Sequence, residues 1–210
     1  NVNFTTVNDL PLMATTPSLT ISEGATVVVT AADLGTISDS DTSDDKISIK
    51  LSNVQHGWFT NDGSPQPDGG QVSLQDVTDG KISFVHDGSN DQPSFSVALK
   101  DDVMANFGGP VAGNVIYTAI NDAPVVGSPA ALMISEGETV TITTAHLGSI
   151  SDSDDVAADL TVKVTGVEHG YFTKSGETLG DGAEFALSEV TAGNITFVHD
   201  GSEQAPHFKV

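Results

Sequence analysis

The 210-residue sequence repeats itself with an offset of 113 residues between the two copies. The motif ISEG occurs at Ile21–Gly24 and again at Ile134–Gly137, and the motifs ISDSD and FVHDGS recur at the same offset. Residues 8–97 align with 121–210 without a gap, and 42 of the 90 aligned pairs are identical. Because this period exceeds that of small solenoid units, which is about 20–50 residues, each copy is expected to fold as a domain.

The start of the chain carries part of a further copy. Asn1–Pro11 aligns with Asn114–Pro124, so residues 1–7 are predicted to be the last strand of a preceding repeat. The predicted boundaries are 1–7 for that strand, 8–120 for the first repeat and 121–210 for the second. Because Val210 aligns with Val97, we expect the second repeat to lack its final strand.

Strand signals dominate both copies. In the segment 47–54 the apolar residues Ile47, Ile49 and Leu51 alternate with polar ones, and the same alternation begins again at Leu160. Alternation with a period of two marks a strand with one buried face. Further strands are predicted at 18–21, 25–30, 57–60, 71–74, 81–86, 94–100 and 112–119, with equivalents in the second copy. The predicted fold class is all-β, with tandem antiparallel β-sandwiches of immunoglobulin or cadherin type.

The charge of the chain excludes several classes of function. Twenty-nine Asp and Glu residues face seven lysines and no arginine, which gives a formal charge of −22 at pH 7. Such a chain cannot hold a phosphate backbone or insert into an anionic membrane surface, so neither nucleic acid nor direct membrane insertion is expected. Cysteine is absent, which excludes disulfides and cysteine-based zinc sites.

No motif of a catalytic centre is present. The sequence has no G-x-S-x-G, no P-loop and no H-E-x-x-H, and the acidic pairs are too many to single out one. The repeated histidines, His56 with His169 and His86 with His199, are interpreted as structural. We therefore predict that the chain is not an enzyme and has no catalytic or organic-cofactor residues.

Taken together, the motifs NDAP, ISEG, ISDSD, HG-x-F and FVHDGS resemble the cadherin-like repeats of the chondroitin sulfate proteoglycan type. Such repeats occur in animal cell-surface proteoglycans and in tandem arrays of bacterial surface adhesins. The absence of cysteine and arginine and the similarity of the two copies favour a bacterial array.

The resemblance implies calcium at the junctions between domains, since cadherins bind it there through acidic linkers, an early Glu, a late Asp and a D-x-D pair. Transferred to this sequence, the junction between the two repeats would use Asn121, Asp122, Glu23, Asp101, Asp102, Asp152 and Asp154. The junction before the first repeat would use Asn8, Asp9, Asp39 and Asp41. A second interpretation remains open, in which ND-x-P is a turn and SDSD a solvated loop, because Asn and Asp bond their own backbone in turns.

The leading functional hypothesis is a stalk segment of a large secreted or cell-surface adhesin or biofilm protein, stiffened by calcium between neighbouring repeats of the chain. One alternative is a self-assembling filament or surface layer, in which residues 1–7 of one copy complete the second repeat of another by strand addition. A second alternative is a weak module for a cell-surface or matrix glycan, acting by avidity. The aromatic residues Trp58, Phe59, Tyr171 and Phe172 would be its candidates, although core or rim packing is the favoured interpretation of them.

Overall fold

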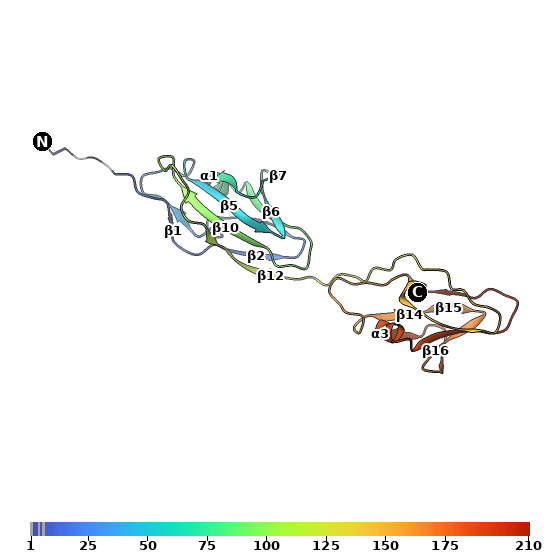
Figure 1. The fold of residues 1–210 in the computed structure, drawn as a ribbon. Helices are drawn as coiled ribbons and strands as arrows, with labels where there is room; N and C mark the ends of the chain where they lie inside the picture. Colours follow the sequence, from blue (N-terminus) through green and yellow to red (C-terminus); the bar gives the residue numbers. More distant parts are fainter. Residues whose placement is uncertain (1, 4, 6) are drawn as a thin grey trace. The chain divides into compact units, whose positions relative to one another are not determined.

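The computed structural model describes residues 2, 3, 5 and 7–210, which form two compact units that divide between Ile120 and Asn121 (Figure 1). The predicted strand at 1–7 includes residues 1, 4 and 6, which lie outside the described residues, so that assignment stays a prediction. We call residues up to Ile120 unit 1 and residues from Asn121 unit 2.

Unit 1 is built almost entirely of short strands. Its elements are β1 (Leu12–Met13), β2 (Ser18–Ser22), β3 (Thr26–Val28), β4 (Ile37–Ser38), β5 (Ser48–Gln55), β6 (Gly57–Asn61), β7 (Ser64–Pro65), β8 (Gly70–Ser73), α1 (Leu74–Thr78), β9 (Ile82–His86), β10 (Ser94–Lys100), β11 (Val111–Ala112) and β12 (Asn114–Thr118).

Two four-stranded antiparallel sheets make the sandwich of unit 1. Their strand orders are β11-β10-β5-β8 and β3-β9-β6-β7. The predicted alternation at the start of β5 is confirmed, because Ile49 and Leu51, together with Ile47 just before the strand, are at most 1% exposed. Phe59 and Phe84 meet edge to face at a centroid distance of 5.0 Å in the core. This arrangement confirms the predicted all-β sandwich.

One pair of strands departs from the antiparallel prediction. β12 pairs with β2 in parallel, with Asn114 opposite Ser18 and Thr118 opposite Ser22. A parallel pair needs a long connection between its strands, and here almost the whole unit forms that connection. β12 thereby covers Leu19 and Ile21, which are 1% and 4% exposed.

Unit 2 repeats the plan with shorter strands. Its elements are β13 (Thr139–Thr141), α2 (Thr144–Leu147), β14 (Thr161–Lys163), β15 (Thr165–Glu168), β16 (Gly170–Lys174), β17 (Glu177–Leu179), β18 (Glu184–Ala186), α3 (Leu187–Thr191), β19 (Ile195–His199) and β20 (His207–Lys209). A four-stranded antiparallel sheet, β13-β19-β16-β17, faces the pairs β14-β18 and β15-β20.

The strand predicted at 131–134, the counterpart of β2, does not form. Residues 131–135 form no strand in the described part of unit 2, whereas their counterparts pair with β12. The prediction of a strand here is therefore wrong. The backbone N–H and C=O groups of a strand need a neighbouring strand to pair with, and the apolar pattern of the segment alone does not provide one.

The buried histidines hold loops together in both units. Nδ1 of His86 accepts backbone N–H bonds from Gly24 at 3.3 Å and Gly88 at 3.1 Å, so the ring carries its proton on Nε2. Nε2 lies 3.1 Å from the carbonyl oxygen of Asp91, to which it donates. His199 makes the equivalent three contacts, which agrees with the structural interpretation of this repeated residue.

Candidate functional site

Most of the residues predicted as metal ligands gather where the chain enters each unit. In unit 1 the short pair β1–β4 lays the segment after Asn8 along the loop Asp39–Asp41, which we call the first DSD loop. The Asp9 backbone N–H donates to Oδ2 of Asp41 at 3.1 Å, and the Ser40 hydroxyl donates to Oδ2 of Asp9 at 2.6 Å. These two bonds clamp the entering chain onto the loop.

The first DSD loop is shaped by its own aspartate. Oδ1 of Asp39 accepts the backbone N–H groups of Asp41 and Thr42, each at 3.0 Å, which is the geometry of a turn closed by an Asp side chain. Its second oxygen, Oδ2, is buried and has no hydrogen-bond partner. A buried carboxylate oxygen without a partner is costly, and a bound cation would relieve that cost.

Unit 2 repeats this arrangement atom for atom at Asp152–Asp154, the second DSD loop. The backbone N–H of Asp122 donates to Oδ2 of Asp154, and the Ser153 hydroxyl donates to Oδ2 of Asp122 at 2.7 Å. Oδ1 of Asp152 accepts two backbone N–H groups, and its Oδ2 is buried without a partner. Asn121 bonds the carbonyl oxygen of Asp122 at 2.6 Å, as Asn8 does that of Asp9 at 2.7 Å.

Asp101 belongs to the entry end of unit 1. Its carboxylate is fully buried and accepts the Asn8 side-chain amide at 2.8 Å and the backbone N–H groups of Val103 and Met104 at 2.9 and 2.7 Å. The Asn8 amide, followed by these backbone donors, lowers the pKa of Asp101 below its usual value and outweighs the opposing effect of burial. Asp101 is thus an ionised group that ties the entry segment to the loop after β10.

The two remaining candidates do not join these clusters. Glu23 accepts the backbone N–H of Ile120 at 2.9 Å, where the chain leaves unit 1, and lies within 3.4 Å of the Tyr117 hydroxyl. Asp102 forms a surface ion pair with Lys46 at 3.2 Å. Unit 1 therefore separates Glu23 from Asp101, although the sequence transfer assigned both to one junction; the reason is that β10 and β12 end at opposite ends of the unit (Figure 1).

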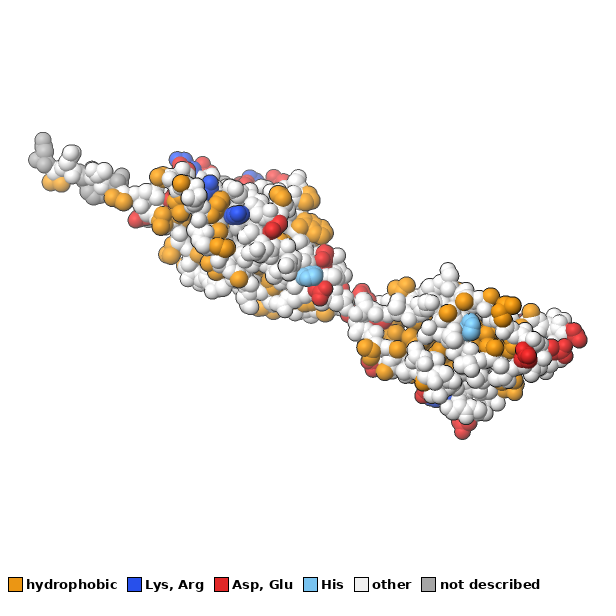
Figure 2. All heavy atoms as spheres, in the orientation of Figure 1, with side chains coloured by type: hydrophobic (Ala, Val, Ile, Leu, Met, Phe, Trp, Pro, Cys, Tyr) orange, Lys and Arg blue, Asp and Glu red, His pale blue; other side chains and the backbone are white. Residues whose placement is uncertain are grey.

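The donor chemistry of the DSD loops fits calcium, but the number of donors in each unit is incomplete. Calcium takes about 6–8 oxygen ligands, and these loops offer carboxylate oxygens, including the two buried ones without partners. Within the described residues, no group of three or more Asp, Glu, His or Cys side chains is placed to hold one metal ion. The acidic side chains visible in Figure 2 are spread over the surface rather than gathered in one basin.

Sequence reasoning missed the serines of the DSD loops. Ser40 and Ser153 supply the hydroxyl half of each clamp. The signal was present, since both serines recur at the 113-residue offset, but a hydroxyl between two acids is an ordinary turn residue and suggests no partner.

A duplicated all-β sandwich with acidic entry loops defines a tandem repeat module, and comparison with known families identifies its family. The profile of the cadherin-like family matches residues 11–109 and 124–210, so the chain belongs to that family. Its two matches correspond to the two units of the structure.

Two relatives are similar over much of the chain. FRAS1-related extracellular matrix protein 1 of Homo sapiens is 27% identical over 205 residues, which cover 93% of this chain and 9% of that protein. Chondroitin sulfate proteoglycan 4 of Rattus norvegicus is 24% identical over 143 residues, which cover 64% of this chain and 6% of that protein. The chain thus spans less than a tenth of either relative. No helix in the described part of the chain is long and apolar enough to cross a membrane.

Proposed function

We propose that this chain is a non-enzymatic stalk segment of a secreted or cell-surface adhesin or biofilm protein. The observation that carries the proposal is the repetition of one sandwich with the same entry clamp at a fixed offset. A spacer needs this design, because its length is set by the number of equal units rather than by one specialised site. The relatives support an extracellular setting, since one is named for the extracellular matrix and the other as a proteoglycan.

Calcium is part of this proposal as the ion that stiffens the stalk. Each DSD loop supplies several oxygens, and the remainder of a full shell would come from backbone carbonyls, water or a neighbouring repeat. The negative charge of the chain favours a divalent cation, because clustered carboxylates repel one another until a cation lies between them. Bound calcium would then hold the entering segment against its loop.

The test is thermal unfolding of the chain with calcium and after chelation. At a free calcium concentration one hundred times Kd, binding to the folded state alone adds about 2.7 kcal/mol. For a unit of this size that shift raises Tm by about 10–20 °C. Small-angle scattering in the same two conditions measures the stiffening, and an unchanged Tm and radius of gyration would reject the calcium part.

A pair of matched variants separates calcium binding from loop geometry. Asp152→Asn keeps an oxygen for the turn bonds but removes the charge at the buried oxygen, so it should abolish much of the calcium shift in unit 2. Asp155→Asn removes an exposed charge next to the same loop and should leave the shift in place. Equal responses of the two variants would show that calcium acts on net charge rather than at the loop.

A further inference from the structure

An exposed aromatic side chain occupies the same place in both units. Trp58 on β6 and Tyr171 on β16 are each 38% exposed (Figure 1). Their neighbours in the sequence, Phe59 and Phe172, are 2% and 1% exposed and pack on other phenylalanines in the cores. Because side chains alternate along a strand, Trp58 and Tyr171 lie on the outer faces of their sheets.

The rows of side chains beside each aromatic residue carry no charge. In each sheet the aromatic residue stands opposite a valine of the central strand, and that valine pairs in turn with a threonine. We call these residues and the next outward pair the neutral face, which consists of Trp58, Val85, Thr26, Ser83 and Val28 in unit 1 and of Tyr171, Val198, Thr139, Thr196 and Thr141 in unit 2. The neutral face thus combines one aromatic ring with several hydroxyl groups.

A hydrogen-bonding cluster lies two residues from Trp58, where β6 begins. The Asp87 backbone N–H donates to the His56 carbonyl at 3.3 Å, and Nδ1 of His56 lies 3.4 Å from the Ser89 hydroxyl. That hydroxyl donates to Oδ1 of Asp87 at 2.6 Å. Oδ2 of Asp87 is 3.9 Å from Nδ1, beyond hydrogen-bond distance, so this oxygen is able to accept a further hydroxyl. Unit 2 repeats the cluster with His169, Asp200 and Ser202.

The backbone before each aromatic residue holds a conformation that few residues adopt. His56 and His169 have φ of 53° and 55°, in the left-handed region. After His56 the chain passes over the core at Gly57, where an added Cβ would come within 2.6 Å of the Phe84 ring. This turn fixes the start of β6, so Trp58 is presented on a rigid strand rather than on a loop.

We propose that the neutral face of each unit binds an uncharged glycan, with one pyranose ring stacked on Trp58 in unit 1 or on Tyr171 in unit 2. One face of a pyranose ring presents several C–H groups, which suit the electron-rich face of an aromatic ring. The sugar hydroxyls would donate to the Asp87 carboxylate or its counterpart Asp200. The inference depends neither on calcium nor on the stalk function.

The charge of the chain disfavours an anionic partner. The chain carries −22 at pH 7, and Asp87 and Asp91 lie beside the platform in unit 1. Sulfated glycans, glycans with uronic acids and nucleic acids would be repelled by these charges. An uncharged glycan meets no such repulsion.

The neutral face is also too small for a protein partner. A specific protein interface buries about 800 Å² on each side and has an apolar core. Within the neutral face, the exposed apolar side chains are Trp58 and Val28 in unit 1 and Tyr171 in unit 2. A second copy of the chain would in addition bring its own negative charge. One aromatic ring instead matches the area of one sugar ring.

The two units should differ in affinity. Tryptophan offers a larger ring system than tyrosine, so Trp58 provides the wider platform. Unit 1 also has Asp91, whose Oδ2 lies 3.7 Å from Nδ1 of His56, where unit 2 has Gln204. A carboxylate is the stronger acceptor for a sugar hydroxyl, and we therefore expect tighter binding at unit 1.

The first measurement titrates the chain with neutral hexasaccharides built from glucose, galactose, mannose, xylose or N-acetylglucosamine. Trp58 is the single tryptophan, so its fluorescence reports binding at unit 1. Because one stacked ring and a few hydrogen bonds carry the contact, we expect saturation by at least one of these sugars with a Kd of about 1 mM. A chondroitin sulfate hexasaccharide, which is anionic, should bind more weakly by about tenfold or more.

Matched variants locate the site, with binding followed by NMR shifts of the backbone amides in β6 and β9. Trp58→Ala should weaken binding at unit 1 by about tenfold or more. Trp58→Tyr, which copies unit 2, should retain binding with a loss of only a few-fold. Ile116→Ala removes an exposed apolar side chain from β12 in another sheet and should leave the affinity unchanged. Thermal melts confirm that each variant is folded.

Three outcomes would overturn the proposal. One is the absence of a saturable change in fluorescence and in amide shifts with every neutral sugar of the panel. Another is binding that survives Trp58→Ala combined with Tyr171→Ala, which assigns the contact to a different surface. The third is tighter binding of the chondroitin sulfate hexasaccharide than of any neutral sugar, which shows that stacking on an uncharged face is not the basis of recognition.

Discussion

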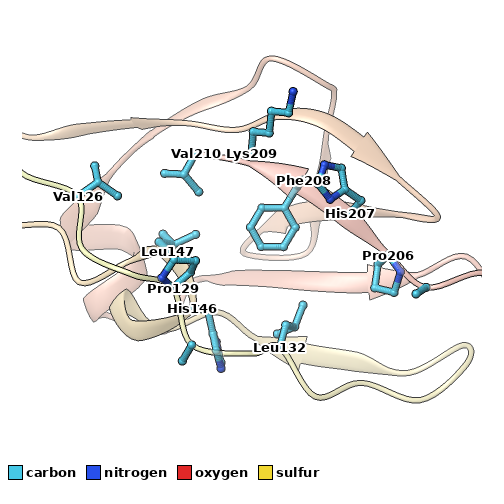
Figure 3. Close-up of a pocket in the computed structure, with 12 residues that line it drawn as sticks. Val126, Pro129, Leu132, His146, Leu147, Pro206, His207, Phe208, Lys209 and Val210 are labelled. Carbon is cyan, nitrogen blue, oxygen red and sulfur yellow. The ribbon is translucent and has the colours of Figure 1, made fainter.

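The two units have nearly the same sequence pattern, but unit 1 buries its apolar side chains more completely than unit 2 does. In unit 1, Leu19, Ile21 and Phe95 are 1%, 4% and 2% exposed beneath and beside β12. Their counterparts Leu132, Ile134 and Phe208 are only partly buried and line two hollows at the surface of unit 2, one of which is shown in Figure 3. Among the described residues of unit 2, no strand pairs with segment 131–135.

This difference teaches that β2 is a strand because of its partner. The segments 18–22 and 131–135 share Leu, Ile and Ser at the same positions, yet only the first forms ladder bonds. Strand propensity expresses packing against neighbours rather than a preference of the backbone alone. The comparison can therefore be tested by substituting residues of β12 in unit 1 and the partly buried apolar residues of unit 2.

The largest effect is expected from shortening the paired phenylalanines. Phe95→Ala should destabilise unit 1 by about 3–5 kcal/mol, because the ring is buried and packs edge to face on Phe59 at 5.6 Å. Phe208→Ala should cost unit 2 about half as much, since its ring is only partly buried. Denaturant unfolding measures both, and Trp58, the single tryptophan, reports unit 1 by its fluorescence.

Equal losses for the two alanine variants would break the comparison. They would mean that the Phe208 ring is packed in solution as closely as the Phe95 ring.

A somewhat smaller effect is expected from a charge on the inner face of β12. Val115→Asp should destabilise unit 1 by about 2–3 kcal/mol, because the aspartate cannot stay in the apolar site and β12 loses its anchor. Unit 1 should then resemble unit 2, with Leu19 open to solvent. Hydrogen exchange of the backbone amides in β2 measures this change.

The matched control for that variant is Ile116→Asp. Ile116 neighbours Val115 but lies on the outer face, so the substitution should change stability by less than about 0.5 kcal/mol. If both variants release β2 equally, the strand is held by something other than its inward side chain.

Sequence reasoning predicted what depends on local pattern and missed what depends on distant partners. The alternation at Ile47, Ile49 and Leu51 fixed which face of β5 is buried, and the structure confirms it. The bond between Asn8 and Asp101 joins residues 93 positions apart, and only the folded sandwich brings them together. The parallel pairing of β2 with β12 was not predicted either, because the two strands lie far apart in the sequence.

One part of the pH dependence should be shared by both units, because it comes from a loop that recurs in each. The Ser89 hydroxyl donates to Asp87 at 2.6 Å and lowers the pKa of that carboxyl, and Ser202 does the same for Asp200. A lowered pKa stabilises the folded state fully above the ordinary value of about 3.8. That contribution is lost as the pH falls through the lower pKa of the folded protein.

Asp87→Asn and Asp200→Asn should therefore each lower stability slightly at pH 7, and the difference from the parent chain should shrink as the pH falls below about 3.8 and through the lowered pKa of each carboxyl. Thermal melts between pH 2 and pH 7 measure it, with Asp155→Asn as an exposed control. A deficit that persists unchanged at the lowest pH would mean that the side-chain amide disturbs the loop in some way other than through charge.

The smallest effect is expected where the two units differ in one capping residue. In unit 1, Oδ2 of Asp33 accepts both the backbone N–H and the hydroxyl of Thr30, at 2.8 and 2.6 Å. In unit 2 the equivalent acceptor for Thr143 is Nδ1 of His146, at a longer 3.2 Å. A carboxylate is the stronger acceptor and also suits the start of the short helix α2.

His146→Asp should therefore stabilise unit 2 by about 0.5–1 kcal/mol, and the reciprocal Asp33→His should destabilise unit 1 by a similar amount. Calorimetry that resolves the two units measures both, and a loss of stability in His146→Asp would show that His146 is needed for packing beside Leu147 rather than for its cap.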